Sequence, residues 1–207
     1  GRMDQLRAYS QHMATEGVAG VRINYRRLSE GTPFVTAKQD VEDAIDFIRK
    51  HADEFHFDLT RLGMAGASAG AVLTSLVAQE TPECSCYIAF NGGFDLVNRG
   101  NSTFPGAKEM KTMFGAVSED KLCAASSIYH IKNDPPDTLL LHGTADSVID
   151  CDQAKRFAAA ILAKGGMAKV VLYEGEEHGF FNANRRCFPE ILTEVEKHME
   201  RVFKLDN

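Results

Sequence analysis

The apolar positions of the chain follow two spacings, one typical of helices and one typical of buried strands. Leu6, Tyr9 and Met13 recur every three to four residues, as on one face of a helix. Elsewhere short, nearly continuous apolar runs indicate strands that are buried on both faces. We expect strands at residues 18–24, 61–66, 86–90, 138–143 and 168–175.

Helical periodicity fills most of the chain between these runs. We expect helices over about 41–55, 69–80, 152–166 and 189–203, with short helices around 108–114 and 119–125. Strands that alternate with helices of this length form right-handed βαβ units. The sequence therefore predicts an α/β fold, a doubly wound and mostly parallel sheet with helices on both faces. The length fits one domain over residues 1–207, with residues 91–137 as an insertion of loops and short helices near the site.

Composition and charge exclude several kinds of partner. The net charge is −6 and no basic run is present, which argues against nucleic acid. No apolar stretch approaches the ~20 residues that a membrane-spanning helix needs. The five cysteines form no C-x-x-C pair, which fits free thiols, although one disulfide and three free cysteines would give the same count. No signal peptide is visible, so the location stays open between cytoplasmic and secreted.

The segment from Gly66 to Gly70, which reads GASAG, places a serine among small residues between a predicted strand and a predicted helix. This is the context of a nucleophile elbow, a strained turn that leaves no room for larger neighbours. The helix behind it directs its N–H groups toward developing negative charge. The same pattern arises by chance in roughly one chain of this size in fifteen. Ser68 is therefore a candidate nucleophile only in combination with partner residues.

An acidic residue follows the most apolar predicted strand, in the stretch LLLHGTADSVID. Asp146 lies in the loop directly after that strand, where a carboxylate could orient a histidine base. The ordinary alternative is an aspartate that stabilises a turn. Asp150 and Asp152 compete for the role, but Asp152 stands at an expected helix N-cap and Asp150 lies near it. His142, at the end of the strand, is interpreted as structural.

His178 is the candidate base, because it follows the next strand in a loop with glycines on both sides, YEGEEHGFF. A lone histidine in a loop is usually just solvated, but this one completes a set. Ser68, Asp146 and His178 follow successive strands in the order Ser–Asp–His. Since the carboxyl ends of parallel strands meet at one edge of a sheet, we expect the three side chains to lie within hydrogen-bonding reach.

With these motifs the sequence resembles the α/β-hydrolase superfamily, in particular its microbial esterase/lipase branch, which includes acetylxylan and feruloyl esterase-like enzymes. The stretches that carry the resemblance are INYRR, TPFVTAKQDVEDAIDFIRKHADEFHFDLTRLGMAGASAGA, LLLHGTADSVI and EGEEHGFF. The resemblance implies a carboxylesterase-type serine hydrolase for short-chain esters, acetyl or feruloyl esters of carbohydrates among them. It implies Ser68 as nucleophile, His178 as base, Asp146 as the residue that orients it and the backbone N–H of Ala69 as an oxyanion donor. No metal or cofactor is implied.

The sequence departs from that family in two places. Ala67 stands where hormone-sensitive-lipase relatives usually carry an acidic residue, which favours the carbohydrate-esterase-like branch. The family also has an H-G-G-G or G-G-G-[WF] oxyanion loop upstream of the position of Gly1, and its third strand lies between those expected at 18–24 and 61–66. The resemblance therefore implies an N-terminally truncated hydrolase, with a homo-oligomer or a missing N-terminal segment left open. We expect that 18–24 and 61–66 pair directly or that the strand between them is borrowed from another polypeptide.

Two other functions stay open at this point. A relative of the prolyl-oligopeptidase type would use the same residues on a peptide. A hydrolase-fold fragment without the oxyanion loop would be an inactive binding scaffold. Residues 91–137 contain no recognisable substrate motif, but they are too short for a large helical lid. We therefore expect short acyl groups to be preferred over long ones.

Overall fold

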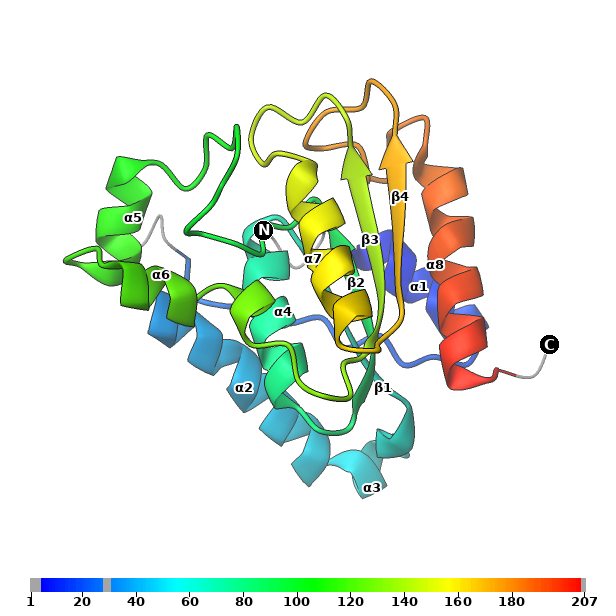
Figure 1. The fold of residues 1–207 in the computed structure, drawn as a ribbon. Helices are drawn as coiled ribbons and strands as arrows, with labels where there is room; N and C mark the ends of the chain where they lie inside the picture. Colours follow the sequence, from blue (N-terminus) through cyan, green and yellow to red (C-terminus); the bar gives the residue numbers. More distant parts are fainter. Residues whose placement is uncertain (1–4, 28–30, 206–207) are drawn as a thin grey trace.

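A four-stranded parallel sheet forms the centre of the molecule (Figure 1). The structure is a computed structural model that describes residues 5–27 and 31–205. Within these residues the strands follow one another in chain order, and every residue of the third strand is buried, as in a parallel strand covered on both faces. The strands are β1 (Leu62–Ala67), β2 (Cys84–Phe90), β3 (Asp137–Gly143) and β4 (Ala168–Tyr173).

Helices cover both faces of this sheet, so the predicted fold class is confirmed (Figure 1). On one face lie α1 (Arg7–Thr15) and α8 (Phe188–Phe203), and on the other lie α2 (Phe34–Lys50), α4 (Ala69–Glu80) and α7 (Asp152–Ala163). The shorter elements are α3 (Ala52–Phe55), η2 (Leu59–Arg61), α5 (Ala107–Phe114), α6 (Glu119–Ala124) and η3 (Ser127–Tyr129). No helix in the described residues has the length and apolar character to cross a membrane.

Two apolar cores, one on each face, hold the helices against the sheet. In the core under α4 and α7 the rings of Phe94 and Phe157 stack with their centroids 4.3 Å apart. In the core under α1 and α8 the ring of Tyr9 lies 5.0 Å from that of Phe90. Since fully burying a large apolar side chain contributes about 1.5–3 kcal/mol, these layers account for most of the stabilisation of the fold.

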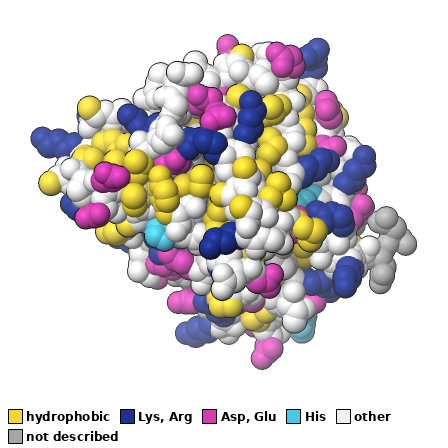
Figure 2. All heavy atoms as spheres, in the orientation of Figure 1, with side chains coloured by type: hydrophobic (Ala, Val, Ile, Leu, Met, Phe, Trp, Pro, Cys, Tyr) yellow, Lys and Arg dark blue, Asp and Glu magenta, His cyan; other side chains and the backbone are white. Residues whose placement is uncertain are grey.

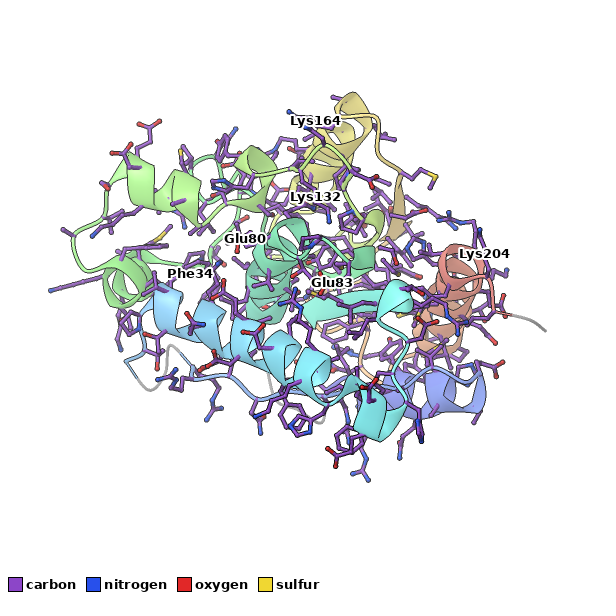
Figure 3. All side chains as sticks on the ribbon, turned by 90° about the horizontal axis from the view of Figure 1, so that it is seen from below. Phe34, Glu80, Glu83, Lys132, Lys164 and Lys204 are labelled. Atoms are coloured by element: carbon purple, nitrogen blue, oxygen red, sulfur yellow. The ribbon has the colours of Figure 1, made fainter. Side chains whose placement is uncertain are left out.

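Ion pairs attach α2 to the end of α4 and to the residues just before β2. Figure 3 labels the two acidic partners, Glu80 and Glu83. Lys38 lies 2.6 Å from Glu80 at the end of α4, and Arg49 lies 2.5 Å from Glu83 just before β2. All four side chains are partly exposed, so each pair contributes at most about 1 kcal/mol. The pairs fix the orientation of α2, while its buried face supplies the larger stabilisation.

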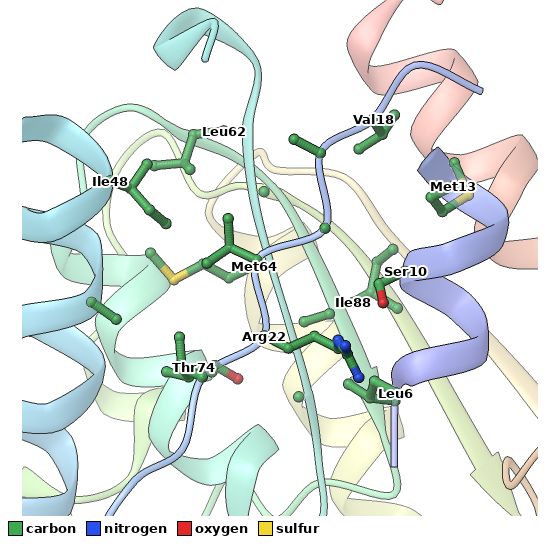
Figure 4. Close-up of a pocket in the computed structure, with 18 of the residues that line it drawn as sticks. Leu6, Ser10, Met13, Val18, Arg22, Ile48, Leu62, Met64, Thr74 and Ile88 are labelled. Carbon is green, nitrogen blue, oxygen red and sulfur yellow. The ribbon is translucent and has the colours of Figure 1, made fainter. Parts of the chain in front are cut away.

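The prediction of a strand at residues 18–24 is wrong. Residues 18–27 form neither helix nor strand, and their side chains are exposed or half-buried. Within the described residues the sheet ends at β1, so 18–24 does not pair directly with it. A cavity of about 1200 Å³ lies between the two instead. A strand forms only beside another strand that shares its hydrogen bonds. The cavity separates residues 18–24 from β1 (Figure 4), so this run has no such neighbour in the described sheet.

Charged side chains of both signs are interspersed on the face seen in Figure 2, and hydrophobic ones gather over α5 and α6. Both helices belong to residues 91–137, the region expected to contain loops and short helices. This face carries no extended patch of positive charge alone or of negative charge alone. The absence of a nucleic-acid partner and the single-domain boundaries stay predictions.

Candidate active site

Ser68 occupies a one-residue turn between a strand and a helix. β1 ends at Ala67 and α4 begins at Ala69, so the chain reverses at the serine itself. Ser68 has φ 52° and ψ −123°, a conformation that residues other than glycine rarely adopt. A side chain on Gly66 would place its Cβ 2.4 Å from the hydroxyl of Thr74, so only glycine fits there. The small neighbours therefore make room for a strained turn that exposes the serine.

Backbone hydrogen bonds continue the sheet beyond its strands and align the residues that follow them. The N–H of Ser68 donates to the carbonyl of Phe90 at 2.9 Å, and the N–H of Asn91 donates to the carbonyl of Leu141 at 2.8 Å. The residues that follow β1, β2 and β3 therefore lie at one edge of the sheet. This is the edge at which parallel sheets commonly carry their sites.

The structure brings the three residues that the sequence singled out into one hydrogen-bonded chain. Nε2 of His178 lies 2.9 Å from Oγ of Ser68, and Nδ1 of His178 lies 2.7 Å from Oδ2 of Asp146. Because the carboxylate can only accept, Nδ1 carries the proton that it donates to Asp146. Nε2 is then an acceptor for the hydroxyl proton of Ser68. This is the arrangement that activates a serine as a nucleophile.

A second glycine allows the loop of His178 to lie on the turn that carries Asp146. A Cβ on Gly143 would fall 2.2 Å from the carbonyl oxygen of Glu176. That same carbonyl accepts a hydrogen bond of 3.0 Å from the N–H of Ala145. The two loops are thus joined through their backbones within a few residues of both side chains, so the distance between His178 and Asp146 depends on glycine at position 143.

The Asp146 carboxylate is buried and fully hydrogen-bonded. Its Oδ1 accepts from the N–H groups of Val148 and Ile149 at 2.8 and 3.0 Å, and its Oδ2 lies 3.2 Å from Nε2 of His142 as well as near His178. Burial alone would raise the pKa of Asp146, but the hydrogen bonds from His142, His178 and the two backbone groups outweigh it and hold the pKa well below its ordinary value. The carboxylate is therefore ionised at neutral pH and can stabilise a protonated His178.

Two further residues contact the hydrogen-bonded series of Ser68, His178 and Asp146, and the sequence analysis did not assign them to it. Asn91 is buried at φ 41°, and its side-chain amide donates to the backbone carbonyl of His178 and lies 2.8 Å from its Nδ1. His142 is fully buried, and its Nε2 lies between Asp146 Oδ2 and the carbonyl of Ile149, 3.0 Å away. Their position in the sequence could have indicated this role, because both residues stand at the carboxyl ends of strands, where parallel sheets commonly carry their sites.

The competing aspartates are not bonded to the histidine. Asp150 accepts hydrogen bonds from the N–H groups of Asp152 and Asn101 at 3.0 and 2.9 Å, and these bonds lower its pKa. Cys151, not Asp152, is the N-cap, because α7 begins at Asp152 itself. The role of Asp150 is to join the loop around residue 101 to the start of α7. Of the three candidate aspartates, only Asp146 is hydrogen-bonded to His178.

The N-terminus of α4 lies directly behind the serine. Ala69 is the first residue of that helix, and the N–H groups of a first helical turn have no carbonyl partner within the helix. They also carry the positive end of the helix dipole. An oxygen that becomes negative beside Ser68 would face this end. The role of Ala69 as oxyanion donor stays a prediction.

The described residues contain one group of side chains close enough to share a metal ion, and neither Ser68 nor its partners belong to it. It consists of His12, Glu16 and Glu196, all partly exposed, at α1 and on α8. Exposed acidic groups of this kind are common without an ion. The hydrogen-bonded chain of Ser68, His178 and Asp146 involves none of them.

Comparisons of the sequence with known proteins match it to esterases. The family model described as BD-FAE matches residues 1–161. A probable isoprenylcysteine alpha-carbonyl methylesterase of Arabidopsis thaliana is 27% identical over 192 residues, which cover 81% of this chain and 40% of the relative. The probable carboxylic ester hydrolase LipM of Mycobacterium tuberculosis is 25% identical over 175 residues, which cover 74% of this chain and 39% of that protein. The chain thus spans about two fifths of the length of the curated relatives it matches.

Solved structures of a bacterial esterase have the same fold. Esterase 2 of Thermogutta terrifontis, phosphonylated by sarin, superposes with a TM-score of 0.89 at 23% identity and covers 100% of this chain and 81% of its own. The propionate-bound form of the esterase from that organism gives a TM-score of 0.85 at 25% identity, covering 100% and 80%. The sheet and its covering helices are therefore those of an α/β-hydrolase fold.

Proposed function

The chain belongs to the BD-FAE family, and we propose that it carries the catalytic residues of a serine carboxylesterase that cleaves short-chain esters. One observation carries the proposal. Ser68, His178 and Asp146 form a hydrogen-bonded chain at the carboxyl edge of the sheet, with bonds of 2.9 and 2.7 Å. The names of the curated relatives, a methylesterase and a carboxylic ester hydrolase, give further support.

In the first half of the proposed reaction Ser68 is acylated. As Oγ attacks the ester carbonyl carbon, its proton passes to Nε2 of His178, which already lies 2.9 Å away. The carbonyl oxygen becomes negative and faces the N–H of Ala69 at the start of α4. The tetrahedral intermediate then collapses, the alkoxide of the alcohol leaves, and Nε2 returns the proton to it.

In the second half water releases the acid. His178 takes a proton from a water molecule whose oxygen attacks the acyl carbon, and the proton then goes to the departing Oγ of Ser68. In both halves His178 becomes positively charged for a time. The buried carboxylate of Asp146, at 2.7 Å, stabilises that charge and keeps the ring in the productive orientation. None of these steps needs a metal or a cofactor.

The substrate class is proposed to be short-chain esters. Acetyl and feruloyl esters of carbohydrates are the candidates that the resemblance implies. The 25% identical esterase of Thermogutta terrifontis binds propionate, which supports an acyl pocket of modest size here. Residues 91–137 also contact the loop that carries Asp146, because the N–H of Thr103 donates to the carbonyl of Val148 at 3.0 Å.

A series of p-nitrophenyl esters tests the proposal. Because all members release the same alcohol, differences in kcat/KM report the acyl pocket alone. We expect acetate and butyrate to exceed dodecanoate by at least about tenfold, since each methylene that finds no room costs affinity for the transition state. A proline-containing peptide p-nitroanilide is the matched control for the peptidase alternative and should be turned over far more slowly. Faster cleavage of the dodecanoate or of the anilide would refute the substrate class.

A further inference from the structure

Asn91 is a second strained residue at the carboxyl edge of the sheet. It follows β2 as Ser68 follows β1, and both residues have a positive φ, 41° for Asn91 and 52° for Ser68. Residues other than glycine rarely adopt such angles, although asparagine tolerates them better than most. Strain of this kind persists only where the surrounding structure enforces it, and it often marks a functional site. The backbone of Asn91 is therefore held in place by its neighbours.

The turn after β2 is tight on both sides of Asn91. The N–H of Asn91 donates to the carbonyl of Leu141 at 2.8 Å, which attaches the turn to β3. The next residue is Gly92, where a Cβ would fall 2.9 Å from the Cβ of Ala71 on α4. The chain thus leaves β2 between the neighbouring strand and α4, and Asn91 is fully buried there.

The buried amide of Asn91 is oriented by His178. Its Nδ2 donates a hydrogen bond to the backbone carbonyl of His178. Its Oδ1 is inaccessible to solvent and has no hydrogen-bond partner among the described residues. Turning the amide over would place Oδ1 against that carbonyl, so that two acceptors would face each other. The donor end therefore faces His178, although this leaves a buried acceptor unsatisfied, which is uncommon in folded proteins.

The same NH₂ group also touches the ring of His178. Nδ2 of Asn91 lies 2.8 Å from Nδ1 of that ring. Because Nδ1 donates its own proton to Asp146, this approach is a close contact and not a further hydrogen bond. One buried side chain therefore contacts both the backbone and the ring of His178, whose own side chain is 25% exposed.

The loop of His178 is otherwise attached to its neighbours at an earlier point. The carbonyl of Glu176 accepts a hydrogen bond of 3.0 Å from the N–H of Ala145, on the turn that carries Asp146. Among the described residues, the amide of Asn91 alone hydrogen-bonds to the backbone of His178 itself. The position of the histidine in its loop thus depends on this one contact from the end of β2.

We propose that Asn91 is a positioning residue, whose amide fixes the backbone of His178 and thereby the distance from its Nε2 to Oγ of Ser68. This role rests on the proposed function, in which Nε2 takes the proton of Ser68 over 2.9 Å. His178 gains and loses a proton in each half of that reaction and must return to the same place. Asparagine suits the position because it tolerates the positive φ and also carries the donor.

Two glycine variants test the role of this side chain. Asn91→Gly keeps the positive φ without strain but removes the amide. We expect kcat for p-nitrophenyl acetate to fall about 10- to 100-fold with little change in KM, because misplacing a reacting group by about 1 Å can cost this much. His56→Gly is the matched control, since His56 also has a positive φ, 56°, but caps α3, ahead of the start of β1 and at the other end of that strand from Ser68. It should keep the kcat of the unaltered protein.

Hydrogen exchange tests the same role without any turnover. Peptides that contain residues 174–182 should exchange faster in Asn91→Gly than in the unaltered protein, and no faster in His56→Gly. If the unaltered protein cleaves no ester, the proposed function fails and the exchange of this loop alone decides the role of Asn91. Unchanged exchange of the loop, or unchanged kcat in Asn91→Gly, would overturn it. If Asn91→Gly fails to fold, Asn91→Ser takes its place in both measurements, since a serine holds a similar φ at position 68.

Discussion

Replacing Ser68 with alanine is expected to lower kcat/KM for p-nitrophenyl butyrate by about 10⁵- to 10⁶-fold, the loss seen when a nucleophile of this kind is removed. The reason is geometric, since the hydroxyl of Ser68 is the one that lies 2.9 Å from Nε2 of His178. The measurement is a steady-state comparison of the two proteins at matched concentration, supported by their Tm values. Alanine adopts the angles of Ser68 no more easily than serine does, so the Tm should stay close to that of the unaltered protein.

A second serine serves as the control for that result. Ser85 lies at the start of β2, at the end of the sheet opposite the proposed site, and its hydroxyl donates to the carbonyl of Leu62 at 3.3 Å. Ser85→Ala should change kcat/KM by less than about threefold, because such a hydrogen bond contributes only about 0.5–1.5 kcal/mol to stability. Turnover by Ser68→Ala at the unaltered rate would mean that another group is the nucleophile.

Asp146→Asn is expected to lower kcat by about 10⁴-fold while leaving the fold intact. Oδ1 of Asp146 accepts from the N–H groups of Val148 and Ile149, so an asparagine would keep its carbonyl oxygen there. Its NH₂ group would then stand at the place of Oδ2, facing Nδ1 of His178. Since an NH₂ group donates, His178 would carry its proton on Nε2 and could no longer accept the proton of Ser68. The measurement is kcat for p-nitrophenyl acetate across pH 6–9.

The same substitution at a neighbouring aspartate provides the matched control. Asp150 bonds to Asp152 and Asn101 and not to His178. Asp150→Asn should therefore change kcat by less than about threefold. A loss of the same size in both variants would show that the loop as a whole, and not the carboxylate of Asp146, determines the activity.

Much of this architecture could be predicted because periodicity and strand order are local properties of the sequence. α4 covers residues 69–80 as expected, since Gly66 to Gly70 marks its start and an uninterrupted apolar surface follows. Ser68, Asp146 and His178 could be placed together because each follows a strand, and parallel strands end at one edge. The order of three residues along the chain was thus enough to predict a contact between loops 110 residues apart.

What could not be predicted depends on neighbours that a local pattern does not contain. The run at 18–24 has the composition of a strand, but a strand forms only where another strand offers hydrogen bonds, and here the run faces the cavity beside β1. Asn91 and His142 were missed for a related reason. Asn91 contributes to the site by contacting the carbonyl of His178, and His142 does so by contacting the carboxylate of Asp146. Neither contact has a sequence signature.

Labelling with a fluorophosphonate probe tests the central claim most directly, because the reagent reacts with a serine only when a base activates it. The protein is incubated with the probe in its folded state and again after denaturation, and the site of attachment is read by mass spectrometry of its peptides. We predict a single adduct on Ser68 in the folded protein, none after denaturation and none in Ser68→Ala. An adduct on another residue, or an unlabelled Ser68 in the folded protein, would contradict the proposal that Ser68, His178 and Asp146 work together as a hydrolase.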